Sequence, residues 1–176
     1  MKKNNFYLKS GGDMADKRFD RRTKDQFKKD IRKSTKEQSA ILRSWLFSSN
    51  QQHLIAWDHG VDNSGEFINS ANNVTCDPDY EIEKYGLVEV QYSNPMCIKY
   101  FHIKKNKLLT CVVQDANILM VNGWSSDHPK YTLLTPGQCK VILARFELVN
   151  WYGGGSKAAY RVPTHFFEWK ELKKCQ

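Results

Sequence analysis

The sequence of 176 residues contains no apolar run of about 18 residues, the length that a membrane-spanning helix needs. Its first residues also lack the apolar centre of a secretory signal peptide. The five cysteines are odd in number, widely scattered and without a Cys-x-x-Cys pair, which argues against a zinc ribbon and a disulfide framework. These absences favour a cytoplasmic protein with reduced thiols and no membrane partner.

Acidic residues are scarce relative to basic ones, with 19 Asp and Glu against 27 Lys and Arg and a formal net charge of +8. Such a balance favours a polyanion as partner, because cations steer phosphates and release their counterions. The basic excess lies mainly before residue 37 and at the C-terminus, where it could also be a solvated surface. Apolar residues make up 40% of the chain, which is ordinary for a globular protein. We expect a flexible leader over residues 1–13 and one domain over 14–176.

The hydrophobic pattern changes repeatedly between helical and strand-like periods. It predicts a helix over 24–48, strands over 53–61 and 66–68, a hairpin over 76–92, a helix over 107–115, a strand over 118–121, a helix over 135–148, a strand over 158–162 and a closing helix or strand over 165–172. This alternation indicates an α/β fold.

The segment over 76–92, CDPDYEIEKYGLVEVQY, is the most informative stretch of the chain. Two short extended runs are separated by a turn at 84–86, so the segment predicts a hairpin that brings Asp79 beside Glu89. Two converging carboxylates repel each other, and a divalent cation relieves that repulsion. Mg²⁺ prefers oxygen ligands and commonly acts on phosphates, so a magnesium site is one interpretation. An ordinary solvated hairpin is the other.

The same residues resemble the motif of the PD-(D/E)XK nuclease superfamily, which has the restriction-endonuclease-like fold. Pro78-Asp79 is followed after nine residues by Glu89-Val90-Gln91. The resemblance implies a central mixed β-sheet flanked by helices, with Asp79, Glu89 and the Val90 carbonyl holding Mg²⁺ or Mn²⁺. Gln91 replaces the usual Lys, as in some restriction enzymes of the superfamily, and would orient the attacking water or the phosphate. The implied activity is metal-dependent endonucleolytic hydrolysis of DNA.

Three further residues enter the site through this resemblance. The first core helix of the superfamily often offers a Glu to the metal, and Glu37 is the candidate. Alternatively, residues 34–37 (STKE) form a capping box with Ser34 at the start of a helix. In some members the lysine is displaced to a neighbouring element, which makes Lys99 and Lys104 candidates for the missing catalytic lysine. Alternatively, these lysines contact phosphate or solvent.

Basic residues that could hold nucleic acid gather after the hairpin and beyond the glycine-rich segment 153–155. They are Lys99, Lys104, Lys105, Lys107, Lys157 and Arg161. Three other functions fit the sequence. One is a nucleic-acid-binding protein without catalysis, which Gln91 would favour. Another is a structure-specific nuclease that resolves junctions as a homodimer, and the third is a basic scaffold with no nucleic-acid role.

Overall fold

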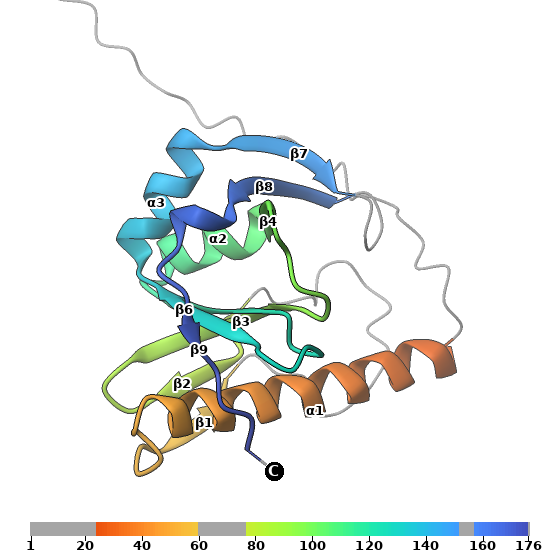
Figure 1. Ribbon diagram of the computed structural model, residues 1–176, viewed down its shortest axis with the longest axis vertical. Coiled ribbons are helices and arrows are strands. Elements are labelled where there is room, and N and C mark those ends of the chain that lie inside the picture. The colour runs from red at the N-terminus through yellow and green to blue at the C-terminus, as the bar shows by residue number, and fades with distance from the viewer. Residues whose placement is uncertain (1–23, 60–76, 152–156, 176) are drawn as a thin grey trace, which may run out of the picture.

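Helices and strands alternate along the chain, as predicted (Figure 1). The computed structural model describes residues 24–59, 77–151 and 157–175, so the predicted leader and the predicted strand over 66–68 lie outside the described residues. The elements are α1 (Lys24–Ser48), β1 (Ala56–Asp58), β2 (Tyr80–Ile82), β3 (Gly86–Ser93), β4 (Tyr100–Lys104), α2 (Lys105–Val113), β5 (Asn117–Asn122), β6 (Lys130–Leu134), α3 (Pro136–Arg145), β7 (Glu147–Trp151), β8 (Lys157–Pro163), the 3₁₀ turn η2 (Thr164–Phe166) and β9 (Lys170–Glu171).

Six strands form a mixed central sheet in the order β1-β2-β3-β5-β6-β9. β3 and β5 are parallel and the other neighbours are antiparallel. The chain between β3 and β5 passes through α2, which supplies the long crossover that parallel neighbours need. A second, antiparallel sheet has the order β4-β8-β7. The predicted α/β class, with a mixed central sheet and flanking helices, is confirmed.

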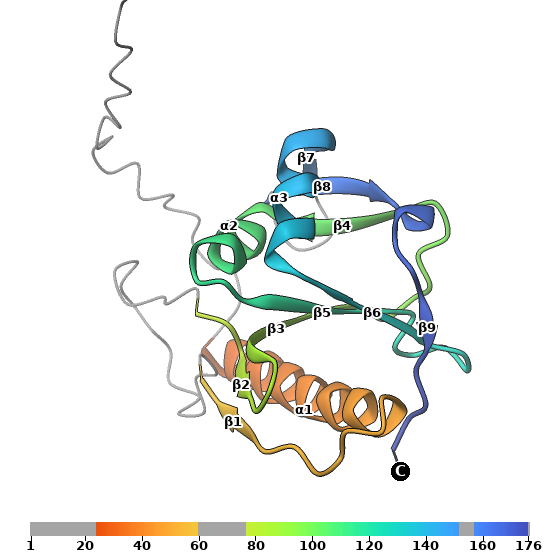
Figure 2. The same cartoon turned by 90° about the vertical axis from the view of Figure 1, so that its left-hand side faces the viewer.

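The central sheet is covered on both faces (Figure 2). α1 packs on one face, and α2, α3 and the second sheet lie over the other. β3 and β5 are therefore buried on both sides, which explains why their sequences, LVEV and ILMV, are almost continuously apolar. The site residues predicted on β3 lie inside this layered core.

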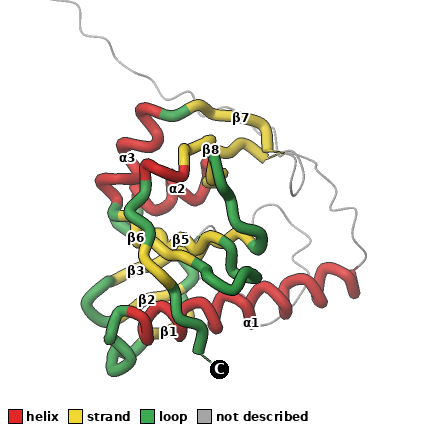
Figure 3. The backbone as a smooth tube through the Cα atoms, in the orientation of Figure 1, coloured by secondary structure: helices red, strands yellow, loops and turns green. Residues whose placement is uncertain are grey.

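The loops that follow β3 and β5 run side by side at one end of the sheet (Figure 3). Trp124 N–H donates to the Ser93 carbonyl at 2.8 Å. Asn122, buried at the end of β5, uses both of its side-chain groups on one neighbour: Oδ1 accepts from Cys97 N–H at 2.7 Å and Nδ2 donates to the Cys97 carbonyl at 3.0 Å. The loop that leads into β4 is thereby fixed to the central sheet.

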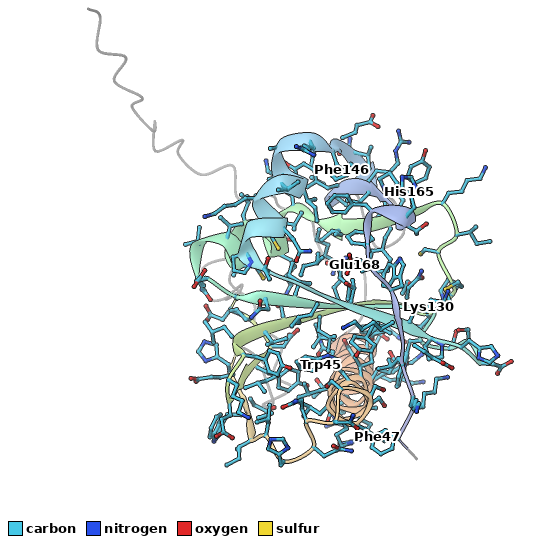
Figure 4. All side chains as sticks on the ribbon, turned by 60° about the vertical axis from the view of Figure 1, so that its left-hand side comes forward. Trp45, Phe47, Lys130, Phe146, His165 and Glu168 are labelled. Carbon is cyan, nitrogen blue, oxygen red and sulfur yellow. The ribbon has the colours of Figure 1, made fainter. Side chains whose placement is uncertain are left out.

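α1 has the bounds that its apolar stripe predicts, and its N-terminal part extends beyond the sheet (Figure 1). Trp45 points toward the sheet, whereas Phe47 points outward (Figure 4). Ser34 lies well inside α1, so the capping-box alternative is wrong, because an interior residue cannot cap the helix start. Within the described ranges no helix is both long and apolar enough to cross a membrane; α1 is long but charged.

The predicted helix over 135–148 is too long. α3 ends at Arg145, and Leu148 is a β7 residue opposite Tyr160 of β8. The competing strand pairing decides the structure of this segment, as tertiary contacts often override helix propensity. The closing segment over 165–172 divides into part of η2 and the short β9. In the described part of the predicted strand over 53–61, which ends at residue 59, only β1 is a strand.

A complete capping box starts α3. Thr135 Oγ1 accepts from Gln138 N–H at 3.3 Å, and Gln138 Oε1 accepts from Thr135 N–H at 2.9 Å. We expect Thr135→Ala to lower the free energy of unfolding by about 1 kcal/mol, because the Gln138 N–H loses its acceptor. Thr135→Ser keeps the hydroxyl and should lose much less. Urea denaturation measures both variants, and equal losses would contradict a role for the hydroxyl.

Candidate active site

The two predicted carboxylates lie across the β2–β3 hairpin. Tyr80 is opposite Val88, and the same antiparallel register places Asp79 opposite Glu89. Asp79 precedes β2, and its Oδ2 accepts from Val90 N–H at 2.8 Å. The carboxylate thus provides a hydrogen-bond acceptor for an N–H of β3, just beyond the end of the backbone pairing between β2 and β3. Both side chains are buried, with 7% of Asp79 and 2% of Glu89 exposed.

Side chains alternate along β3 as predicted. Val90 belongs to the core on the α1 side, whereas Glu89 and Gln91 contact elements on the opposite side. Gln91 Nε2 donates to the His102 carbonyl of β4 at 2.7 Å. The amide of Gln91 therefore joins β3 to the edge strand of the second sheet.

Lys107, in the first turn of α2, makes the closest charged contact with the pair. Its Nζ lies 2.6 Å from Glu89 Oε1. From sequence, Lys107 is predicted only as a nucleic-acid contact, and Lys99 or Lys104 as the replacement lysine. Lys104 is near enough for its charge to lower the pKa of Glu89, while Lys99 is exposed in the loop before β4.

Two buried oxygens on this face of β3 have no hydrogen-bond partner among the described residues: Glu89 Oε2 and Gln91 Oε1. Such atoms are rare in folded proteins, and each costs about 1–3 kcal/mol when it is left without a donor. The two residues are two positions apart on one strand, so their side chains point into the same layer. Acceptor oxygens that lack donors are what a hard cation requires.

Burial raises the pKa of both carboxylates. For Glu89 burial is the largest cause and the negative charge of Asp79 the second; with Lys107 opposing them, the pKa is about 7. Burial also raises the pKa of Asp79, against the lowering effects of Lys107, of Val90 N–H and of a hydrogen bond from Glu89. The coupled pair therefore retains a proton toward neutral pH, and a cation would displace it.

α1 reaches the pair through Gln38, and the structure does not bring Glu37 to it. Gln38 Nε2 donates to Asp79 Oδ2 at 3.2 Å. Glu37 Oε2 instead accepts from Tyr92 OH at 2.6 Å, and Tyr92 packs on the α1 side of β3, away from Glu89. The sequence holds a signal for Gln38, because an amide within the apolar stripe of a helix needs a partner.

The other predicted contacts are spread over three elements. Lys104, Lys105 and Lys107 gather where β4 ends and α2 begins. Arg161 lies on β8 and forms an ion pair with Glu147. Lys157 begins β8, and the glycine-rich segment 153–155 lies outside the described residues.

The sequence matches no protein-family model, no curated protein and no solved structure. What the site can do therefore has to be inferred from its own geometry. The oxygen atoms at this site are those of two carboxylates, with the amide oxygen of Gln91 in the same layer.

This donor set limits the kind of metal that the site could hold. Among the residues that the structure describes, no three His, Cys, Asp or Glu side chains gather in a way that could hold an ion. Mg²⁺ needs fewer protein ligands, because it commonly binds through one or two carboxylates together with water and substrate phosphate. Asp79 and Glu89, with the unpartnered oxygen on Glu89, fit Mg²⁺ or Mn²⁺ in that mode.

Proposed function

We propose that this protein is a metal-dependent endonuclease that hydrolyses DNA phosphodiester bonds. The observation that carries the proposal is the buried pair of Asp79 and Glu89. Within the described part of the chain Glu89 Oε2 lacks a hydrogen-bond partner, and Lys107 Nζ lies 2.6 Å from Glu89 Oε1. Converging buried acids with raised pKa values destabilise a fold, and such groups are concentrated in active sites, where their function outweighs this cost.

The element order supports a restriction-endonuclease-like core of the PD-(D/E)XK type. α1 precedes the antiparallel strands β1, β2 and β3, and α2 then leads to β5, which lies parallel to β3. Glu89 lies on β3, and Asp79 lies directly before β2 and opposite Glu89 in the same register. A helix and then an apolar strand after the Glu-x-Gln segment is the order that the resemblance implies.

Asp79 and Glu89 would hold the cation, with the Val90 carbonyl as a further oxygen ligand. A bound divalent cation polarises the scissile phosphate and lowers the pKa of a bound water. The chain fixes Asp79 in advance through Val90 N–H and Gln38. The hydrogen bond from Gln91 Nε2 to β4 likewise fixes the orientation of Gln91, whose oxygen would direct a water or a phosphate. Such support keeps the site in its reactive geometry.

Lys107 would supply the positive charge that Gln91 lacks. It lies at the N-terminal end of α2 with Lys104 and Lys105, and the first turn of α2 itself contains no acidic residue and no side-chain cap. Cations there oppose the helix macrodipole and are locally unfavourable. The same combination of lysines and a positive helix end attracts phosphate, which supports a binding role for this segment.

A plasmid nicking assay tests the proposal. We expect supercoiled DNA to be nicked with Mg²⁺ or Mn²⁺ and to stay intact in EDTA. Lys107→Met should lower the nicking rate by about a hundredfold, the scale on which one group that stabilises transition-state charge contributes. Lys140→Met, at an exposed position of α3, is the matched control and should retain the wild-type rate. Equal cleavage in EDTA would contradict metal dependence.

One observation favours a second function, DNA binding without cleavage. Lys107 already neutralises Glu89 through a direct contact, and the side-chain amide of Gln91 already donates a hydrogen bond to β4. On this interpretation the carboxylates and the lysine form a structural cluster beneath a basic surface. DNA affinity that is unchanged by EDTA, with no nicking under either ion, would select this function over the endonuclease.

A further inference from the structure

The outer face of the second sheet carries aromatic and basic side chains. Tyr100, His102 and Lys104 alternate along β4 with the buried Phe101, so they point away from the core. Arg161 of β8 lies opposite His102 and shares that face. We refer to Tyr100, His102, Lys104 and Arg161 as the β4–β8 surface.

The centre of this surface combines a ring with a cation. Arg161 Cζ lies 5.2 Å from the centroid of the Tyr100 ring, and Tyr100 is 45% exposed. Glu147 offsets part of the charge of Arg161, but Lys99 adds an exposed positive charge directly before Tyr100. Proteins that bind single-stranded nucleic acid use this combination, because bases stack on the rings while cations hold the phosphates.

Ile98, two residues before Tyr100, adds a second exposed apolar side chain to this region. Its side chain is 84% exposed although its backbone is held in place. Thr164 Oγ1 donates to the Ile98 carbonyl at 2.5 Å, and Thr164 N–H donates to the Lys99 carbonyl at 3.0 Å. One exposed apolar residue is ordinary. This one is presented on a fixed backbone, two residues from an exposed tyrosine and among positive charges, which favours a partner that is both apolar and anionic.

β4 connects this surface to the proposed active site. His102, two residues after Tyr100, accepts the hydrogen bond from Gln91 through its carbonyl. Two residues span about 7 Å of strand, so Tyr100 and the Gln91–His102 hydrogen bond are separated by about the length of one or two nucleotides. A strand that crosses the site toward Tyr100 would pass along β4.

We propose that the β4–β8 surface stacks an unpaired base, so that the preferred substrate is DNA with a single-stranded segment beside the cleavage position, such as a flap or a branch. The inference rests on the proposed function and names its substrate class. Base faces are covered inside an uninterrupted duplex, where Tyr100 and Ile98 would have nothing apolar to contact. An unpaired strand offers one face for each base.

The test is DNA binding in EDTA, which separates recognition from cleavage. Fluorescence anisotropy compares a single strand, a blunt duplex and a duplex with a single-stranded flap. We expect the single strand and the flap to bind more tightly than the blunt duplex. Tyr100→Ala should weaken their binding by about tenfold, within the range that one base–aromatic stack provides, and change duplex binding by less than about twofold. Ile98→Ser should act in the same direction.

Val113→Ser and Trp57→Ala are the matched controls, because both side chains are exposed and apolar but lie on other elements. They should leave all three affinities unchanged. An equal loss for single-stranded and duplex DNA in Tyr100→Ala would overturn base stacking. A second result would also overturn it. If the wild type is a dimer, and Ile98→Ser dissociates the dimer but leaves DNA affinity unchanged, the region around Ile98 binds a second copy of the chain. Preferential single-strand binding without any nicking would instead overturn the nuclease and leave this surface assignment standing.

Discussion

Asp79→Asn should lower the rate of DNA nicking by about 10²- to 10³-fold, the scale of removing one group that stabilises transition-state charge. The substitution keeps the size of the side chain and an oxygen that can accept from Val90 N–H, the contact now made at 2.8 Å. It removes the negative charge that would hold the cation. The fold should therefore survive while cleavage is lost, and initial nicking rates at saturating Mg²⁺ measure the difference.

Glu81→Gln is the matched control for this variant. Glu81 lies on β2 within the same hairpin, opposite Leu87, but its side chain is exposed. It should nick DNA at the wild-type rate. An Asp79→Asn protein that also kept the wild-type rate would remove the carboxylate pair from the mechanism, and the acids would then have only a structural role.

The hairpin that carries these acids could be predicted because its determinants are local. The turn at 84–86 contains two residues in the left-handed region, Lys84 at φ 69° and Gly86 at φ 65°. Glycine adopts that conformation readily, so the position of Gly86 marks where the chain reverses. Once the turn is placed, strand alternation gives the faces of Glu89 and Val90 directly.

The contacts between elements could not be predicted in the same way. Adjacent residues on a helix point about 100° apart, so the choice between Glu37 and Gln38 depends on how α1 is rotated on the sheet. Gln38 falls within the apolar stripe and Glu37 at its edge, so the stripe indicates that Gln38 faces the sheet but does not identify the residue it contacts there. Lys107 meets Glu89 only because α2 packs over β3. β4 and β9 likewise pair with strands that are distant in sequence, β8 and β6.

Without divalent cations, the free energy of unfolding should fall as the pH rises from about 5 to about 7. The pKa of Glu89 is raised from the ordinary value of 4.5 to about 7. Between these values the folded state keeps a proton that the unfolded state releases, so raising the pH favours unfolding. Above pH 7 the raised pKa of Glu89 lowers the free energy of unfolding by about 3 kcal/mol. The raised pKa of Asp79 acts in the same direction.

Glu89→Gln should remove most of this pH dependence, because the amide does not titrate. At pH 8 without metal the variant should unfold at a higher denaturant concentration than the wild type, whereas Glu83→Gln, exposed in the hairpin turn, should behave like the wild type. Lys107 loses its ionised partner in Glu89→Gln, but its side chain remains partly exposed to water, so this loss should be small.

Mg²⁺ or Mn²⁺ should reverse the loss of stability in the wild type, and more strongly at pH 8 than at pH 5. A ligand that binds only the folded state stabilises it according to its concentration relative to its dissociation constant, and protons compete for the same carboxylates at low pH. Glu89→Gln should respond much less to the ions. A wild type whose stability neither falls toward pH 7 nor responds to either ion would mean that Lys107 alone balances the buried charge of Glu89. The cluster would then be structural, which would contradict a cation site at these carboxylates.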